Sequence, residues 1–375
     1  MRFPDQESQD RFDWKQSKAF IGEIEGFLAV LEDRLIEFKE VYFRGMTLTE
    51  EEMIELFYFK FTGTPLLNRM DAIKDYFIDS WETLNGRNIS DDDQETLQMK
   101  FDKMYKTKDI YAIYNWMLED CGCNLLPDVP YEKRKLPYED VFPMLYLKYR
   151  LSGGNSTHKN IKHLVIDEMQ DYSYLQYTIL EMLFHCRMTI LGDRAQTLDT
   201  KQQDVLRFLP KLLGRKIRTI EIKKSYRNTL EIARYAEKVS GVSDLELLDR
   251  HGKEVVEKTF NTDTELLDEL VCHLKCPGDF ETAALITTTE EEAFDLSRLL
   301  KLRGINVSYV DRNSSAFKKG LTVTTFYLAK GLEFDQVFAL RGAKENPLKN
   351  QAEYICATRA LHELYIYEIT DSLSK

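Results

Sequence analysis

The spacing of apolar residues divides the chain into two patterns that meet near residue 160. Before that point apolar residues recur every three or four positions, which is typical of amphipathic helices. The longest run predicts one helix of about six turns. It carries Phe20, Ile21, Ile24, Phe27, Leu28, Leu31, Leu35 and Phe38. Further helices are predicted at residues 49–59, 65–84, 92–104, 109–119 and 138–150.

Two details refine this helical part. Thr49 and Glu52 have the spacing of a capping box, and Ser90 with Asp93 is a weaker start signal. The aromatic residues within 56–61 could form a surface on which nucleic-acid bases stack or a core between helices, and their pattern favours the core. They are Phe57, Tyr58 and Phe61, next to Leu56.

After residue 160, short β-branched runs alternate with helical periods, which predicts parallel α/β units. A linker is predicted at Gly153-Gly154-Asn155-Ser156. The predicted strands are 162–167, 187–191, 217–222, 254–260, 282–287, 305–310, 321–326, 335–340 and 364–369. The predicted helices are 173–184, 202–212, 228–239, 262–274, 289–302 and 350–361.

Composition indicates a folded protein of more than one domain. The chain has 375 residues, of which 43% are hydrophobic. It contains no apolar run of about 18 residues and no signal-peptide pattern, so we expect a cytoplasmic protein that does not enter a membrane. The six cysteines lack the spacing of a zinc site or a redox pair, which favours reduced thiols.

Charge is distributed unevenly along the chain. The formal net charge is −12, and residues 1–160 hold 30 acidic and 21 basic side chains. A protein that grips nucleic acid mainly by neutralising phosphates is expected to be basic. We therefore expect any nucleic-acid contact to be local, and the acidic N-terminal part to suit a protein partner.

Candidate chemistry lies where the predicted strands end, because ligands of open α/β sheets bind at the carboxyl ends of the strands. Asp167 and Glu168 follow one apolar run. One carboxylate could hold magnesium while the other polarises an attacking water. The alternative for such a strand end is a solvated turn.

Three more places carry polar groups, at residues 190–196, at residues 223–229, and at residues 329–335 with 354–360. Gln196 could bond a terminal phosphate, although Gly192-Asp193 also simply makes a turn. Arg227 offers a planar guanidinium that could bond phosphate oxygens, and Tyr226 offers a ring face on which a base could stack. The alternative is that both residues simply begin a helix, with their side chains in solvent. Arg359 is a second arginine that could neutralise a transferring phosphoryl group.

A phosphate-binding loop is not found in the sequence. No Gly-x-x-x-x-Gly-Lys-Ser/Thr occurs, and the one Gly-Lys pair, Gly252-Lys253, is followed by Glu254.

Taken in order, these motifs resemble those of the superfamily 1 helicases of the UvrD, Rep and PcrA group over residues 138–369. The resemblance implies an α/β fold with RecA-like lobes that binds ATP, Mg²⁺ and DNA, either single-stranded or a duplex with a single-stranded end. It makes Asp167 the magnesium ligand, Glu168 the base, Gln196 the γ-phosphate sensor, and Tyr226 the adenine platform. It makes Arg227 and Arg359 the γ-phosphate arginines, Glu333 the ribose contact, Gln170 a coupling residue, and Thr325 and Tyr327 neighbours of the DNA. Tyr327 stands where these helicases usually have histidine.

A narrower resemblance, to HelD-type ATPases that associate with bacterial RNA polymerase, rests on residues 138–148, 329–335 and 358–364. It implies an all-helical insertion at 1–136, the C-terminal part of a first RecA-like lobe at 137–214, and a second lobe at 215–375. It places the phosphate loop upstream of residue 1. We therefore expect these residues to be the C-terminal part of a longer protein and to be inactive alone. We also expect a monomer.

Two functions remain open on this evidence. The chain is either part of an ATP-driven helicase or translocase, or a non-hydrolysing module that docks on RNA polymerase through its acidic helical domain.

Overall fold

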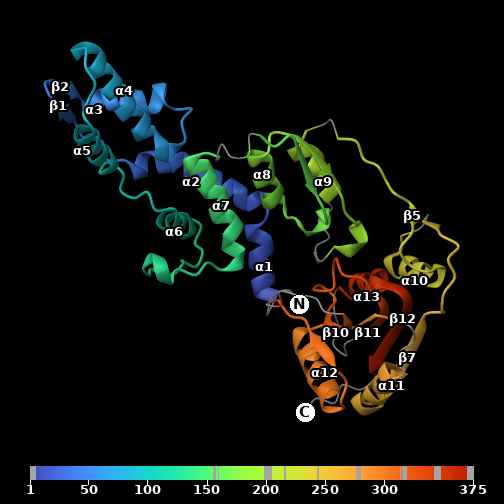
Figure 1. Ribbon diagram of the computed structural model, residues 1–375. Coiled ribbons are helices and arrows are strands. Elements are labelled where there is room, and N and C mark those ends of the chain that lie inside the picture. Colours follow the sequence, from blue (N-terminus) through green and yellow to red (C-terminus); the bar gives the residue numbers. More distant parts are fainter. Residues whose placement is uncertain are drawn as a thin grey trace. The chain divides into compact units, whose positions relative to one another are not determined.

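The computed structural model describes residues 6–154, 158, 160–197, 205–214, 217–242, 245–275, 280–312, 314, 319–341 and 348–369 (Figure 1). These fall into two compact units. The helical unit comprises Asp5–Val165 and Tyr172–Thr189, and the sheet unit comprises Ile166–Asp171 and Ile190–Lys375. The domain boundaries expected near residues 137 and 215 remain predictions.

The helical unit is built from amphipathic helices around one apolar core. Its α-helices are α1 (Gln6–Lys15), α2 (Lys18–Leu35), α3 (Glu50–Glu55), α4 (Arg69–Asn85), α5 (Asp91–Asp102), α6 (Ile110–Asp120), α7 (Tyr138–Ser152) and α8 (Tyr174–Leu183). Short turns of other helix types are η1 (Leu56–Lys60), η2 (Leu66–Asn68) and η3 (Tyr131–Lys133).

The predicted helix starts are confirmed by their caps. Thr49 and Glu52 form a reciprocal capping box at α3, and the Ser90 hydroxyl accepts a hydrogen bond from the Asp93 amide at α5. Helix α2 buries the predicted apolar stripe. Phe57 is fully buried, which confirms the core interpretation of the aromatic segment.

The expectation of an all-helical N-terminal part is wrong in one place. Strands β1 (Val41–Phe43) and β2 (Met46–Leu48) pair as an antiparallel hairpin. Its turn residues Arg44 and Gly45 have φ of 43° and 89°. Two positive φ values are what a two-residue hairpin needs, but they are usually supplied by Asn-Gly or Asp-Gly. Arg-Gly gives a weaker signal in the sequence.

The sheet unit is organised around a six-stranded parallel sheet in the order β7-β12-β11-β8-β10-β9 (Figure 1). The strands are β7 (Val256–Phe260), β8 (Thr282–Thr287), β9 (Val307–Tyr309), β10 (Gly320–Thr325), β11 (Phe334–Arg341) and β12 (Ala360–Ile369). The helices of the unit are α9 (Val205–Leu212), α10 (Leu230–Ser240), α11 (Asp263–Lys275), α12 (Glu290–Leu302) and α13 (Lys349–Arg359).

Both faces of this sheet are covered, because side chains alternate along each strand. Ala284 and Ile286 of β8 pack with α10 and α13, whereas Leu285 between them packs with α11 and α12. Val337 and Phe338 of β11 divide in the same way. The result is a three-layer α/β/α arrangement.

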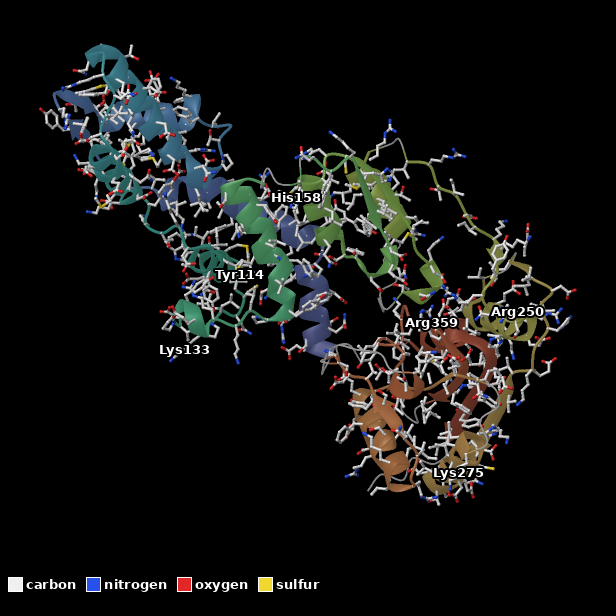
Figure 2. All side chains as sticks on the ribbon, in the orientation of Figure 1. Tyr114, Lys133, His158, Arg250, Lys275 and Arg359 are labelled. Carbon is white, nitrogen blue, oxygen red and sulfur yellow. The ribbon has the colours of Figure 1, made fainter. Side chains whose placement is uncertain are left out.

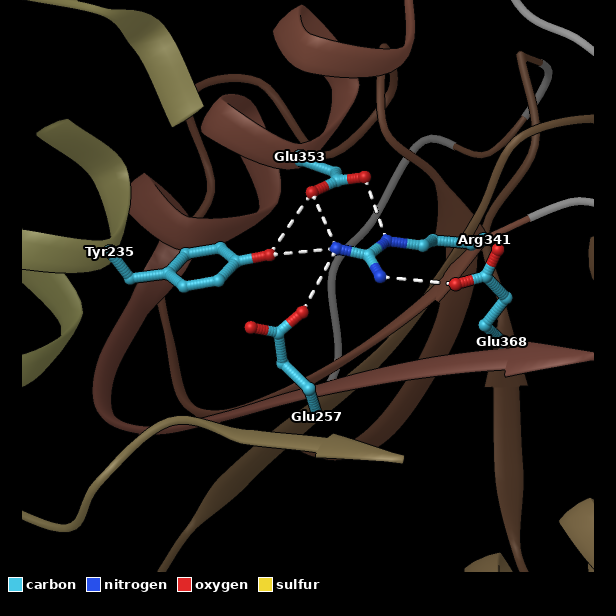
Figure 3. Close-up of polar contacts among 5 residues, drawn as sticks. All are labelled: Tyr235, Glu257, Arg341, Glu353 and Glu368. Carbon is cyan, nitrogen blue, oxygen red and sulfur yellow. Dashed lines mark hydrogen bonds and ion pairs between the residues drawn. The ribbon is translucent and has the colours of Figure 1, made fainter. Parts of the chain in front are cut away.

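Arg341 joins several elements of the sheet unit (Figure 3). From the end of β11 it bonds Glu353 of α13, Glu368 of β12 and Glu257 of β7. It also donates to the hydroxyl of Tyr235 on α10, which in turn donates to Glu353 at 3.0 Å. This group of five residues is called the Arg341 cluster below.

Two-stranded pairings complete the described part: β3 (His163–Ile166) with β4 (Arg187–Ile190), and β5 (Lys224–Ser225) with β6 (Glu246–Leu247). The predicted strand 217–222 is wrong, since these residues form no regular element and Ile220 and Ile222 are 69% and 80% exposed. Residues 202–204 of a predicted helix, and Asn155 and Ser156 of the predicted linker, lie outside the described residues.

Candidate functional site

The first part of the site is the acidic turn that follows β3. Asp167 and Glu168 leave the strand directly after buried Ile166, and the Glu168 amide donates to Asp167 Oδ1 at 2.8 Å. Glu168 has a φ of 51°, a left-handed conformation that costs a residue with a Cβ about 1 kcal/mol or more. The turn therefore holds this carboxylate in a specific, mildly strained orientation.

Gln170 joins this turn to the end of β4. Its Nε2 donates to Glu168 Oε2, and its Oε1 accepts the Asp193 amide at 3.1 Å. The 3₁₀ turn η5 (Met169–Asp171) that carries it packs tightly on Gly192, where an added Cβ would lie 2.4 Å from Met169 Cγ. Gln170, predicted to couple the metal-binding acids to a neighbouring part, lies where it bridges two strand ends.

Asp193 organises the next turn, η6 (Arg194–Gln196). Its Oδ1 accepts the Ala195 amide at 2.9 Å, and its Oδ2 accepts from Gln196 Nε2 at 3.0 Å and from the Tyr354 hydroxyl at 2.7 Å. Gln196 is buried, and its Oε1 accepts from Arg359 Nη2 at 3.3 Å. A buried hydrogen-bonded path thus runs from Asp193 through Gln196 to Arg359.

Arg359 lies at the C-terminal end of α13 and is only 2% exposed (Figure 2). Its Nε has no hydrogen-bond partner in the described part of the chain. Burial and the nearby Arg227 guanidinium lower the pKa of Arg359, whereas Glu168 and Glu333 raise it. A buried cation with an unused donor is costly unless an anion completes it, so this arginine fits a negatively charged ligand.

Tyr226 and Arg227 follow β5 directly. The Tyr226 ring is 62% exposed, with Lys224 Nζ 5.5 Å from its centroid, and Arg227 Nε lies 2.7 Å from Glu333 Oε1. The segment is anchored by Asn228, whose Nδ2 donates to the carbonyl of Ala360 at 2.6 Å. A flat ring and an arginine are therefore presented side by side from a fixed backbone.

An open cleft of about 560 Å³ brings these groups together. Four predicted site residues line it, namely Gln196, Tyr226, Arg227 and Glu333. The other lining residues are Asp193, Ser225, Asn228, Tyr354, Thr358 and Leu361. Arg359 is bonded to the wall through Gln196. Asp167, Glu168 and Gln170 do not line the cleft, although Glu168 acts electrostatically on Arg359.

The two predicted nucleic-acid residues are not part of this cleft. Thr325 is 1% exposed, and Tyr327 donates its hydroxyl to Glu290 at 2.7 Å beneath the Arg312 guanidinium. A direct contact of Thr325 with DNA would require movement of the surrounding chain. Both roles remain predictions.

Gly252-Lys253 is not a phosphate loop in this structure either. Lys253 Nζ donates to the Tyr365 hydroxyl at 2.8 Å, and the Gly252 amide donates to Glu231. The lysine is therefore engaged on the surface of the sheet.

Several contributors were not singled out from the sequence. Tyr354 lines the cleft and bonds Asp193, and Lys330 forms an ion pair with Asp171. Gly192, which the sequence suggested only as a turn residue, also permits the close approach of η5. Tyr354 had one usable signal, because it lies on the same predicted helix as Arg359.

The site offers carboxylate ligands for Mg²⁺ but not a complete set of protein ligands. The described residues contain no cluster of three or more metal-ligating side chains. Mg²⁺ is commonly held by one or two carboxylates together with substrate phosphates. Asp167, with Oδ2 not engaged by the Glu168 amide, fits that smaller role.

Comparison with known proteins gives one family match. Residues 28–198, somewhat under half of the chain, match the family model described as UvrD/REP helicase N-terminal domain. This supports a superfamily 1 helicase. No curated protein matches the sequence.

Three solved structures illustrate the wider similarity. The C-terminal domain of a possible DNA helicase from Lactobacillus plantarum WCFS1 is 25% identical over 39% of this chain and 88% of its own, with a TM-score of 0.32. The PRRSV helicase is 16% identical over 70% of this chain and 46% of its own, with a TM-score of 0.33. An arterivirus nonstructural protein 10 helicase, solved with DNA, is 17% identical over 32% and 29%, with a TM-score of 0.24.

No helix in the described ranges is both long and apolar enough to span a bilayer.

Proposed function

We propose that the sheet unit binds ATP with Mg²⁺ as part of a superfamily 1 helicase or translocase of the UvrD type. The observation that carries this proposal is the single cleft lined by Tyr226, Arg227 and Gln196, with the incompletely bonded, buried Arg359 attached to its wall. Together these groups offer a stacking face and two cations to one ligand, which is the chemistry of a nucleoside triphosphate.

Each residue has a role within this proposal. Tyr226 stacks on the base, and Arg227 and Arg359 neutralise phosphate oxygens. Arg359 is held by Gln196 until an anion competes for its guanidinium. Glu333 orients Arg227 and would reach the ribose from the same wall.

The acidic turn supplies the remaining chemistry. Asp167 would hold Mg²⁺, which neutralises phosphate charge when bound. Glu168, kept in its strained conformation and bonded by Gln170, would accept a proton from an attacking water. Thr325 and Tyr327 are proposed to lie near single-stranded DNA, and the RecA-like assignment of the two lobes and the HelD-type identity belong to the same proposal.

Base stacking in the cleft can be tested by equilibrium binding of a fluorescent N-methylanthraniloyl-ATP with Mg²⁺. Removing a stacked aromatic ring costs about 1–3 kcal/mol, so Tyr226→Ala should weaken binding by about fivefold or more. Tyr131→Ala is the matched control, because Tyr131 is 79% exposed and belongs to the helical unit. Equal affinities for both variants and the unaltered chain would contradict the proposed site.

We expect binding without efficient hydrolysis. Residues 1–375 contain no glycine-rich phosphate loop, so the backbone amides and lysine that normally cradle the β- and γ-phosphates are not supplied by this sequence. A steady-state phosphate-release assay should give turnover no higher than that of an Asp167→Asn control. Turnover at rates typical of helicases, abolished by Asp167→Asn, would refute this expectation.

A second candidate function is docking on a basic protein surface such as that of RNA polymerase. Residues 50–99 hold 12 acidic and 4 basic side chains. Phe59 is 77% exposed, and Tyr76 is 41% exposed with Lys60 Nζ 3.3 Å from its ring centroid. Binding of the full chain to purified bacterial RNA polymerase should weaken in Phe59→Ala and with rising salt, but not in Tyr131→Ala.

A further inference from the structure

Asp193 receives a hydrogen bond from a helix far away in the sequence. The Tyr354 hydroxyl, on α13, donates to Asp193 Oδ2 at 2.7 Å, the same oxygen that accepts Gln196 Nε2 at 3.0 Å. Tyr354 is 9% exposed, and burial together with Asp193 raises its pKa. The hydroxyl therefore stays protonated and remains a donor.

This bond affects how Gln196 is oriented. A glutamine amide can point its oxygen or its nitrogen at a given neighbour. Here Asp193 accepts from Nε2, so Oε1 faces Arg359. A shift of the Asp193 carboxylate would therefore move the Gln196 side-chain amide, and with it the oxygen that Arg359 bonds.

Helix α13 therefore contacts the η6 turn twice. Tyr354 bonds Asp193, and Arg359, five residues later, bonds Gln196. The four side chains Tyr354, Asp193, Gln196 and Arg359 are buried or lie on the cleft wall. A change in one of the two contacts is therefore expected to alter the other.

We propose that Tyr354 is a positioning residue that fixes Asp193 and, through it, the orientation of Gln196 toward Arg359. The inference rests on the proposed nucleotide site and deepens it, since it names the contact that orients Gln196 and Arg359 before the ligand binds. Tyr354 need not touch the reacting atoms for this role.

The chain offers a matched control in Tyr146. It is also a buried tyrosine, and its hydroxyl donates to a carboxylate, Glu25 Oε1, at 2.6 Å. Tyr146 belongs to the helical unit and does not line the cleft. Tyr354→Phe and Tyr146→Phe thus remove the same hydroxyl donor from a carboxylate, and only the first removal reaches Asp193.

The test is a double-mutant cycle on binding of N-methylanthraniloyl-ATP with Mg²⁺ by the full chain. Tyr354→Phe removes a hydrogen bond to a charged group and should weaken binding by about tenfold or more, while Tyr146→Phe leaves it unchanged. In Gln196→Ala the added Tyr354→Phe change should have little further effect, because the residue it positions is gone.

The outcomes separate the inference from the function on which it rests. If the unaltered chain binds and Tyr354→Phe behaves like Tyr146→Phe, the positioning role is overturned and the nucleotide site stands. Full additivity of Tyr354→Phe and Gln196→Ala would also overturn it. If the unaltered chain binds no nucleotide, the proposed site itself fails and the inference fails with it.

Discussion

Gly192 shows how one residue can decide whether the candidate site forms. A Cβ at this position would lie 2.4 Å from Met169 Cγ, 2.5 Å from Gln170 Oε1 and 2.7 Å from the Met169 nitrogen. The last of these is backbone, which cannot rotate away. The bridge from Glu168 through Gln170 to Asp193 depends on this approach.

Gly192→Ala should therefore destabilise the sheet unit by about 1–3 kcal/mol, the usual cost of overpacking. Gly26→Ala is the control, because a Cβ there meets nothing within 4 Å inside α2 and should be neutral or stabilising by up to about 1 kcal/mol. Urea unfolding of both variants measures the difference. Equal stability of the two would show that the close approach is not required.

His251 lies between the carboxylates of Asp249 and of Glu231, which is in the first turn of α10. Its Nδ1 is 2.8 Å from Glu231 Oε1 and its Nε2 is 3.0 Å from Asp249 Oδ1. The hydrogen bond from His251 lowers the pKa of Glu231 from its ordinary 4.5 to about 2. The same bond, with Asp249, raises the pKa of His251 above its ordinary 6.5.

These shifts define a pH window for the contact. The stabilisation from Glu231 is present above pH 4.5 and is lost as pH falls toward 2, whereas that from His251 is present below pH 6.5 and is lost as pH rises through its folded pKa. In Glu231→Gln the pKa of His251 should return toward 6.5. NMR titration of the His251 imidazole signals measures this change, and an unchanged pKa would contradict the pairing.

At the scale of elements, the Arg341 cluster holds α13 and α10 against β7, β11 and β12. Three carboxylates converge on one guanidinium that is 21% exposed. Because α13 also carries Tyr354 and Arg359, this cluster fixes the helix that forms one side of the cleft.

Arg341→Met should destabilise the sheet unit by about 3 kcal/mol, because it leaves Glu353, whose side chain is only 10% exposed, without its cation. Lys319→Met removes the exposed ion pair with Glu281 and should leave the free energy of unfolding almost unchanged. A loss for Arg341→Met as small as that control would mean that the cluster does not hold these elements.

The sequence predicted most elements because each has its own period. Every strand of the six-stranded sheet was predicted, and β8 matches its predicted bounds of 282–287. Residues 217–222 show the limit, since Ile217, Ile220 and Ile222 favour a strand but pairing requires a neighbour that local propensity cannot reveal. The hairpin β1–β2 was not predicted, because arginine is an unusual residue at the position of its turn where φ is positive.

At the scale of the molecule, the sequence motifs predicted which residues share the cleft, but strand ends explain only part of it. Gln196, Tyr226, Arg227 and Glu333 all line one cleft. Gln196 follows β4 and Tyr226 and Arg227 follow the short β5, as carboxyl-end chemistry predicts, whereas Glu333 lies directly before β11, at the amino end of that strand. The link from Tyr354 to Asp193 joins residues 161 positions apart and depends on how α13 packs. No local pattern encodes such a contact.

Nucleotide binding in the cleft is tested by a crystal structure of the full chain with Mg²⁺ and a non-hydrolysable ATP analogue. The base is expected to stack on Tyr226 and the terminal phosphate to bond Arg227 and Arg359, with the guanidinium of Arg359 turned from Gln196 to the anion. Analogue bound elsewhere on the chain, or a cleft left empty at millimolar analogue, would contradict it.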